Sequence, residues 1–258
     1  MIESLLSLCL TGVAPALPQD WWLQWSLAPA PLVALAGLCW ATRKGTSRER
    51  SLAWSGCLLC ALAWVSPLCR LGATLAAAHM AQLMVVIAAG ALLALGWPPR
   101  TAPRAGTGRL QAMTLLHAVV LWTWHVPAVY TAILADAFVH FVAWAALLAS
   151  AFGFWRAVLQ AAPSRALPPL LAVLATMAHT GLLGALLTLA SRPLYAVQAA
   201  GARAWGLEPL ADQQLAGLLM WVPGSFAYFA VAVGLSLRML RAPDALPGSA
   251  PPEVAAGR

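Results

Sequence analysis

Seven mostly apolar segments follow one another along the chain, separated by short polar or proline- and glycine-rich stretches. A helix needs about 20 predominantly apolar residues to cross the hydrocarbon core of a bilayer. Each segment is close to this length and is predicted to be one span. The predicted spans are residues 21–42, 51–68, 75–97, 110–134, 137–160, 168–190 and 211–240. The pattern therefore predicts an all-α fold, a polytopic membrane bundle of seven transmembrane helices.

Two short segments flank this membrane domain of residues 21–240. Residues 1–20 are predicted to be a short extracytoplasmic segment, and residues 241–258 a flexible cytoplasmic tail. Residues 1–17 faintly resemble a secretion signal, but they carry Glu3 where a signal peptide has basic residues. We therefore expect this segment to stay on the chain.

The basic residues between the predicted spans indicate the orientation. One side of the membrane would receive twelve of the 15 Lys and Arg residues: Arg43, Lys44, Arg48, Arg50, Arg100, Arg104, Arg109, Arg156, Arg165, Arg238, Arg241 and Arg258. The other side would receive three: Arg70, Arg192 and Arg203. Loops rich in Lys and Arg stay in the cytoplasm. The N-terminus is therefore predicted to lie outside and the C-terminus in the cytoplasm.

Composition supports a membrane protein, because 62% of the residues are hydrophobic and 9% are charged. A soluble domain carries roughly 25% charged residues. The net charge of +7 does not indicate nucleic acid as a partner, since the basic residues lie between apolar stretches and form no single basic face. The five cysteines form no zinc pattern, and the pair Cys57 and Cys60 lies inside an apolar run as packing residues.

Several ionisable and sulfur-containing side chains lie toward the predicted outer face, and three of them are histidines at one depth. They are His79, Met80, His125, His140, Asp212 and Met220. Asp212 and Met220 are eight residues apart, so they share one face of the last span, about 12 Å apart along its axis. Ionisable residues inside a membrane are costly and usually face the bundle interior. We therefore interpret the six residues as a candidate metal site.

Each of these residues also has a purely structural interpretation. A buried histidine can satisfy a neighbouring carbonyl, and Asp212 can cap its own helix, where a carboxylate favours the helix dipole. The deeper residues His117 and His179 are as compatible with packing as with function. The clustering of three histidines at one depth favours function for the outer set.

The residue types agree with three kinds of chemistry. A thioether selects Cu(I), and an imidazole binds copper in either oxidation state. Paired histidines on facing helices can also hold a haem iron, and a proton path would use the same residues. The spacing alone leaves all three open.

Other positions predict helix packing and bends. Thr176, Thr180, Gly184 and Thr188 form a stripe of small residues that favours close contact between helices. Pro127 and the pair Pro223-Gly224 are predicted to kink their helices.

Four stretches carry a resemblance to a known family: "AHMAQLMVVIAAGALLALGWP" (78–98), "WTWHVPAVY" (122–130), "GLLGALLTLASRPLY" (181–195) and "DQQLAGLLMWVPG" (212–224). In order over about 60–240, they resemble the multi-spanning CtaG family of bacterial cytochrome c oxidase assembly proteins. The resemblance points to His79, Met80, His125, Asp212, Gln213 and Trp221. The chain departs from it at Leu83, where the family tends to have a second His.

The resemblance implies a cytochrome c oxidase assembly factor in the bacterial inner membrane, a multi-pass protein that is not an enzyme. No nucleophile–base pair, phosphate loop or dinucleotide fingerprint is present. Copper is the expected cofactor and no haem is expected. The expected partners are the membrane and cytochrome c oxidase subunits, with periplasmic copper chaperones as further candidates. The alternatives are a copper transport or tolerance protein and a haem-binding redox protein.

Overall fold

The computed structural model describes residues 9–12, 14–97, 106–161 and 167–240, and within these ranges the protein is built of helices without β-strands. The longer helices are α2 (Pro29–Ala41), α3 (Ser47–Trp64), α5 (Ala76–Gly96), α6 (Thr107–His125), α8 (Ala137–Leu159), α9 (Leu167–Thr188) and α11 (Pro209–Leu240). The short helices are η1 (Trp21–Leu23), α4 (Pro67–Thr74), α7 (Pro127–Ala135), η2 (Ala196–Gln198) and α10 (Ala199–Ala204). The all-helical prediction is confirmed. The predicted tail, residues 241–258, lies outside the described residues, as do residues 1–8 and 13 of the predicted N-terminal segment.

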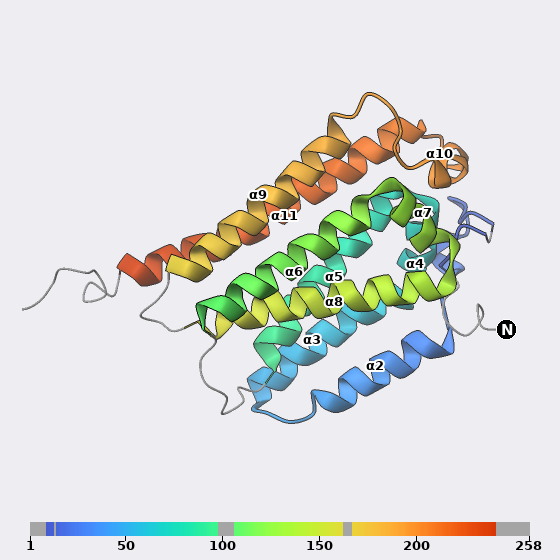
Figure 1. Cartoon of the computed structure of the whole chain (residues 1–258). Coiled ribbons are helices and arrows are strands. Elements are labelled where there is room, and N and C mark those ends of the chain that lie inside the picture. The colour runs from blue at the N-terminus through green and yellow to red at the C-terminus, as the bar shows by residue number, and fades with distance from the viewer. Residues whose placement is uncertain (1–8, 13, 98–105, 162–166, 241–258) are drawn as a thin grey trace, which may run out of the picture.

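Helix α5 is the centre of the bundle. It packs against α3, α4, α8 and α11, and α9 packs along α11. Figure 1 shows the short helices α4, α7 and α10 gathered at one end of the long helices. We call this end the α4/α7/α10 end. Under the predicted orientation it is the extracytoplasmic end.

The described helices give four to six candidate membrane spans. Four helices, α5, α8, α9 and α11, are each long and apolar enough to cross a membrane. Two bent pairs are further candidates: α3 with α4 at 50° and α6 with α7 at 79°. Apolar side chains such as Leu115, Leu186 and Phe226 are exposed on the outer helix faces, as expected of surfaces that meet lipid.

The segment predicted as the first span, residues 21–42, does not form one long helix. Its regular part is the 13-residue α2, about 20 Å long at 1.5 Å per residue, which is shorter than the roughly 30 Å hydrocarbon core. Pro29 occupies the first turn of α2 and Ala28 before it is extended. A proline disfavours the helical conformation in the residue that precedes it, so α2 cannot extend toward residue 21.

Prolines also set the two large bends. Helix α6 ends at His125, Val126 is extended, and Pro127 begins α7. The kink predicted at Pro127 is therefore confirmed, as a 79° bend. In contrast, α11 continues through Pro223 as one helix.

The small residues of α9 allow α11 to approach closely. Thr176, Thr180 and Gly184 are buried, and a Cβ atom placed on Gly217 of α11 would lie 2.6 Å from the Gly184 carbonyl oxygen. Only glycine at position 217 permits this separation of the two backbones. The close contact predicted from the stripe is therefore present between α9 and α11.

Candidate functional site at one end of the bundle

The six predicted site residues lie on four helices at the α4/α7/α10 end. His79 and Met80 are in the first turns of α5, His125 ends α6, His140 is in the first turn of α8, and Asp212 and Met220 are in α11. All six side chains are buried. The structure thus brings together residues separated by more than 130 positions.

His79 lies among aromatic rings from α6, α7 and α8. Its ring centroid is 6.1 Å from that of Trp124, 5.1 Å from that of Tyr130 and 5.5 Å from that of Trp144. The indole N–H of Trp124 donates to His79 Nε2 at 3.3 Å. The lone pair of His79 therefore faces Trp124, and the ring carries its proton on Nδ1.

His140 uses both ring nitrogens in hydrogen bonds. Its Nε2 accepts from the Trp144 indole N–H at 3.0 Å, and its Nδ1 donates to the Ile133 carbonyl at 3.0 Å. Binding a metal through this ring would require one of these bonds to break.

His125 and His79 each have one buried ring nitrogen without a partner in the described residues, but that of His79, Nδ1, carries a proton, whereas that of His125 offers a lone pair. His125 Nδ1 donates to the Leu121 carbonyl at 2.7 Å. Its Nε2 is buried and has no hydrogen-bond partner within the described part of the chain. A buried polar atom without a partner is uncommon and calls for an explanation such as an absent ion or water. His125 and His140 both lie close enough to His79 to interact with it electrostatically.

Asp212 caps a helix, but not its own. The N–H groups of Ala76 and Ala77, at the start of α5, donate to its two carboxylate oxygens at 2.7 and 3.1 Å. The first N–H groups of a helix lack partners within it, and a carboxylate there also stabilises the positive end of the helix dipole. Asp212 thereby fixes the α5 turn that carries His79.

The next residue, Gln213, ties α11 to the chain that follows α9. Its side-chain oxygen accepts from the Leu194 N–H at 2.5 Å, and its amide donates to the Leu187 carbonyl at 3.4 Å. Trp221, farther along α11, packs against Gly181 and Gly184. The distinctive polar start of the last motif is therefore an anchor between helices.

Arg156 has the corresponding role at the other end of α5, although in the sequence it is only a basic residue near a loop. Its guanidinium is buried and donates from Nη1 to the carbonyls of Ala94 and Trp97 at 3.2 and 2.8 Å. A cation at a helix C-terminus complements the dipole. Both ends of α5 are thus held by charged side chains of other helices.

Two tyrosines and a glutamine that were not predicted complete the site. Tyr130 and Tyr195 stack with centroids 3.8 Å apart. The Tyr130 hydroxyl donates to the Gln198 side-chain oxygen at 2.7 Å, and the Gln198 amide donates to the Gly72 carbonyl at 2.6 Å. The Tyr195 hydroxyl donates to the His125 carbonyl at 3.1 Å. Burial raises the pKa of Tyr195, so its hydroxyl stays protonated and keeps this bond. Both tyrosines lie in the resembling motifs, but only their positions in the fold reveal this role.

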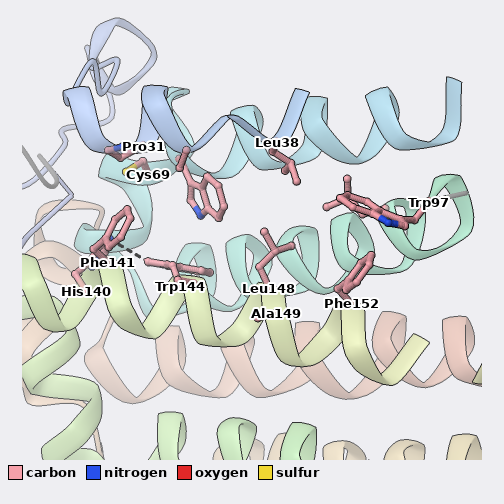
Figure 2. Close-up of a pocket in the computed structure, with 14 residues that line it drawn as sticks. Pro31, Leu38, Cys69, Trp97, His140, Phe141, Trp144, Leu148, Ala149 and Phe152 are labelled. Atoms are coloured by element: carbon pink, nitrogen blue, oxygen red, sulfur yellow. Dashed lines mark hydrogen bonds between the residues drawn. The ribbon is translucent and has the colours of Figure 1, made fainter. Parts of the chain in front are cut away.

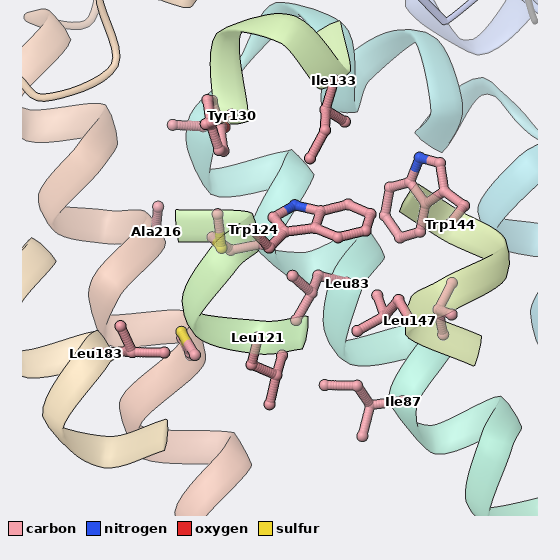
Figure 3. Packing of buried hydrophobic residues seen from close by; sticks show 14 of the residues in the cluster. Leu83, Ile87, Leu121, Trp124, Tyr130, Ile133, Trp144, Leu147, Leu183 and Ala216 are labelled. Carbon is pink, nitrogen blue, oxygen red and sulfur yellow. The ribbon is translucent and has the colours of Figure 1, made fainter. Parts of the chain in front are cut away.

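The thioethers of Met80 and Met220 belong to one buried cluster with Leu121, Trp124 and Leu183. Figure 3 shows the packing of this cluster. Among the residues that the structure describes, no three His, Cys, Asp or Glu side chains are grouped so as to hold a metal ion.

His117, which is buried, and His179, which is half-buried, form a second pair of imidazoles deeper in the bundle. His117 Nδ1 donates to Ser150 Oγ at 3.0 Å, because the Ser150 hydroxyl itself donates to the Leu147 carbonyl. His117 Nε2 and both ring nitrogens of His179 have no partner in the described ranges. The two rings interact electrostatically. Contact with a neighbouring carbonyl, the structural interpretation, does not account for these free nitrogens.

An apolar groove lies beside the site, with His140 and Trp144 in its lining. It has a volume of about 350 Å³ and lies between α2, α5 and α8, with Trp97 and Phe152 toward one end and Cys69 and His140 toward the other (Figure 2). Its lining is almost entirely hydrocarbon and aromatic, so it suits an apolar occupant and not an ion.

These features define a multi-helix membrane protein with a group of buried polar side chains at one end of the bundle. Residues 32–242 match the family model for the cytochrome c oxidase caa3 assembly factor, Caa3_CtaG. The chain belongs to this family, and the resemblance inferred from the four motifs is confirmed. No curated protein and no solved structure matches the chain significantly.

Proposed function

We propose that this protein assists maturation of the copper centre of a cytochrome c oxidase, from the extracytoplasmic face of the bacterial inner membrane. Family membership over residues 32–242 supports the assembly role. The single observation that carries the copper proposal is the buried, unpartnered Nε2 atom of His125. His125 interacts electrostatically with His79, and the thioethers of Met80 and Met220 lie in the buried cluster that contains Trp124.

The donor set fits a soft monovalent ion. Imidazole and thioether ligands together favour Cu(I). The ligands we propose are His125, His79, Met80 and Met220. His79 would exchange the hydrogen bond from Trp124 for the metal. Asp212 and His140, whose polar atoms are already engaged, would act as positioning residues that hold α5 and α8 in place.

The protein would then act as a binding and transfer component without catalysing a reaction of its own. Its partners would be the oxidase subunits and, as donors of the metal, periplasmic copper chaperones. The aromatic rings of Trp124, Tyr130 and Trp144 around His79 would keep water from the bound ion.

Deletion of the gene tests the assembly role. Assembled oxidase and its activity should fall while transcription of the subunits is unchanged. Complementation with the wild-type gene should restore both, and complementation with His125→Ala should not. A deletion strain with normal oxidase, in both copper-poor and copper-replete media, would contradict the proposal.

A copper transporter is the second candidate, and the free nitrogens of His117 and His179 favour it. They lie deeper than the outer cluster and could pass an ion toward the cytoplasm. This function predicts altered cellular copper content in a deletion strain that expresses no oxidase. It also predicts that His117→Ala impairs the protein as severely as His125→Ala.

A further inference from the structure

The N-terminal segment before α2 is fastened across the α4/α7/α10 end. Leu10 and Ala14 offer their carbonyls to the guanidinium of Arg70, whose Nη1 donates to the Leu10 oxygen at 3.0 Å. The Ala16 N–H donates to Thr74 Oγ1 at 2.9 Å. Arg70 and Thr74 both belong to α4, so this helix carries the segment.

Two other elements hold the same segment. The Thr11 N–H donates to the Leu134 carbonyl of α7 at 2.9 Å. The indole N–H of Trp205, at the end of α10, donates to the Ala16 carbonyl at 2.8 Å. The segment is therefore hydrogen-bonded to α4, to α7 and to the end of α10.

These contacts place Cys9 opposite Cys69. The Cα atoms of the two residues are 5.4 Å apart and the structure joins their sulfurs. This separation lies within the range of about 4.4–6.8 Å that a disulfide requires. Both side chains are buried. The other three cysteines, Cys39, Cys57 and Cys60, are free thiols on α2 and α3.

We propose that Cys9 and Cys69 form a disulfide bond in the cell, and that the bond locks residues 9–12 and 14–17 over the α4/α7/α10 end. Structural disulfides form in oxidising compartments and are rare in the bacterial cytoplasm. The bond therefore assigns this end to the extracytoplasmic side. The distribution of Lys and Arg predicts the same orientation from unrelated residues.

The bond forms by exchange. The two thiols lose two protons and two electrons, and the disulfide of an extracytoplasmic thiol–disulfide oxidoreductase accepts them and becomes a dithiol. The locked segment covers a small cavity of about 50 Å³, whose lining includes Leu10, Thr11 and Gln198. The Gln198 side chain accepts a hydrogen bond from the Tyr130 hydroxyl, and the Tyr130 ring packs against the His79 ring. The locked segment is therefore connected to His79 through two buried side chains, Gln198 and Tyr130.

Counting thiols tests the bond. Cells are treated with N-ethylmaleimide before lysis to block free thiols, and the denatured protein is then reduced and labelled with a maleimide–polyethylene glycol. The wild type should gain two adducts, one for each disulfide sulfur. Cys9→Ser and Cys69→Ser should each gain none, and the control Cys57→Ser should still gain two. A wild type that gains no adducts would overturn the proposal. This result would mean either that Cys9 and Cys69 are free thiols or that residues 1–16, with Cys9, are removed from the chain.

A second labelling experiment tests the orientation separately. Gln19 is exposed near the α4/α7/α10 end, and Arg48 is exposed at the start of α3, at the opposite end. In intact sphaeroplasts, a membrane-impermeant maleimide should label Gln19→Cys and not Arg48→Cys. The reverse labelling would overturn the extracytoplasmic assignment. Neither experiment depends on whether the protein binds copper.

Discussion

Replacing Asp212 should destabilise the protein far more than replacing an exposed capping residue. In Asp212→Ala, the N–H groups of Ala76 and Ala77 lose the acceptors that now lie at 2.7 and 3.1 Å. These groups are buried under α11, where water cannot replace the carboxylate. Each unsatisfied buried donor costs about 1–3 kcal/mol. The free energy of unfolding should therefore fall by about 2–6 kcal/mol in total.

Asp136 provides the matched control. It caps α8 by accepting from the Val139 N–H at 2.8 Å, but its side chain is exposed. Loss of an ordinary N-cap costs about 1 kcal/mol, because water takes over the released N–H. Asp212→Asn keeps one acceptor oxygen but leaves the other N–H without an acceptor, and should cost about 1–3 kcal/mol.

Unfolding of the purified variants in detergent micelles, followed by tryptophan fluorescence during titration with SDS, measures these differences. If Asp212→Ala were no less stable than Asp136→Ala, the cap between α11 and α5 would not be a major contact. If Asp212→Asn kept full stability but bound Cu(I) much more weakly, Asp212 would be a ligand and not a positioning residue.

Two further stability predictions use the same assay. Gly217→Ala should lower the free energy of unfolding by about 1–3 kcal/mol, because the added Cβ would meet the Gly184 carbonyl. The control Gly234→Ala, with nothing within 4 Å of the new atom, should be neutral or slightly stabilising. Equal effects of the two substitutions would refute the close α9–α11 contact. Arg156→Ala should lower the free energy of unfolding by about 1.5–3 kcal/mol, because the charged hydrogen bonds to the end of α5 are lost. The exposed control Arg109→Ala should lower it by less than about 0.5 kcal/mol. A neutral Arg156→Ala would contradict the capping role.

Hydropathy predicted the bounds of most long helices well, but it failed where a proline determines where a helix begins. The predicted span 137–160 corresponds to α8 (Ala137–Leu159), and 75–97 to α5 (Ala76–Gly96). Long apolar runs without proline form continuous helices because every backbone group must be satisfied inside the bilayer. The first predicted span failed because a count of apolar residues does not register that Pro29 fixes a helix start.

The sequence predicted the position of the candidate site along the bundle axis, but not the hydrogen-bond partners of its residues. Orientation and helical rise placed His79, His125 and Asp212 near one end of the bundle. The sequence could not indicate which nitrogen is free, because that depends on side-chain geometry, such as the Trp124 indole N–H that reaches His79 from another helix. The capping role of Asp212 was foreseen for its own helix, but its true partner, α5, is set by tertiary packing. Cys9 and Cys69 were missed as a pair because 60 residues separate them.

The measurement that tests the central claim most directly is the Cu(I) affinity of the purified protein, determined by competition with a chromogenic Cu(I) chelator. The wild type should bind Cu(I), and His117→Ala should bind it with the same affinity. His125→Ala should bind Cu(I) at least about tenfold more weakly, because even a change outside the ligand shell costs about 10–100-fold in affinity. Equal Cu(I) affinity in the wild type and His125→Ala, or no binding by either, would contradict the proposed copper site.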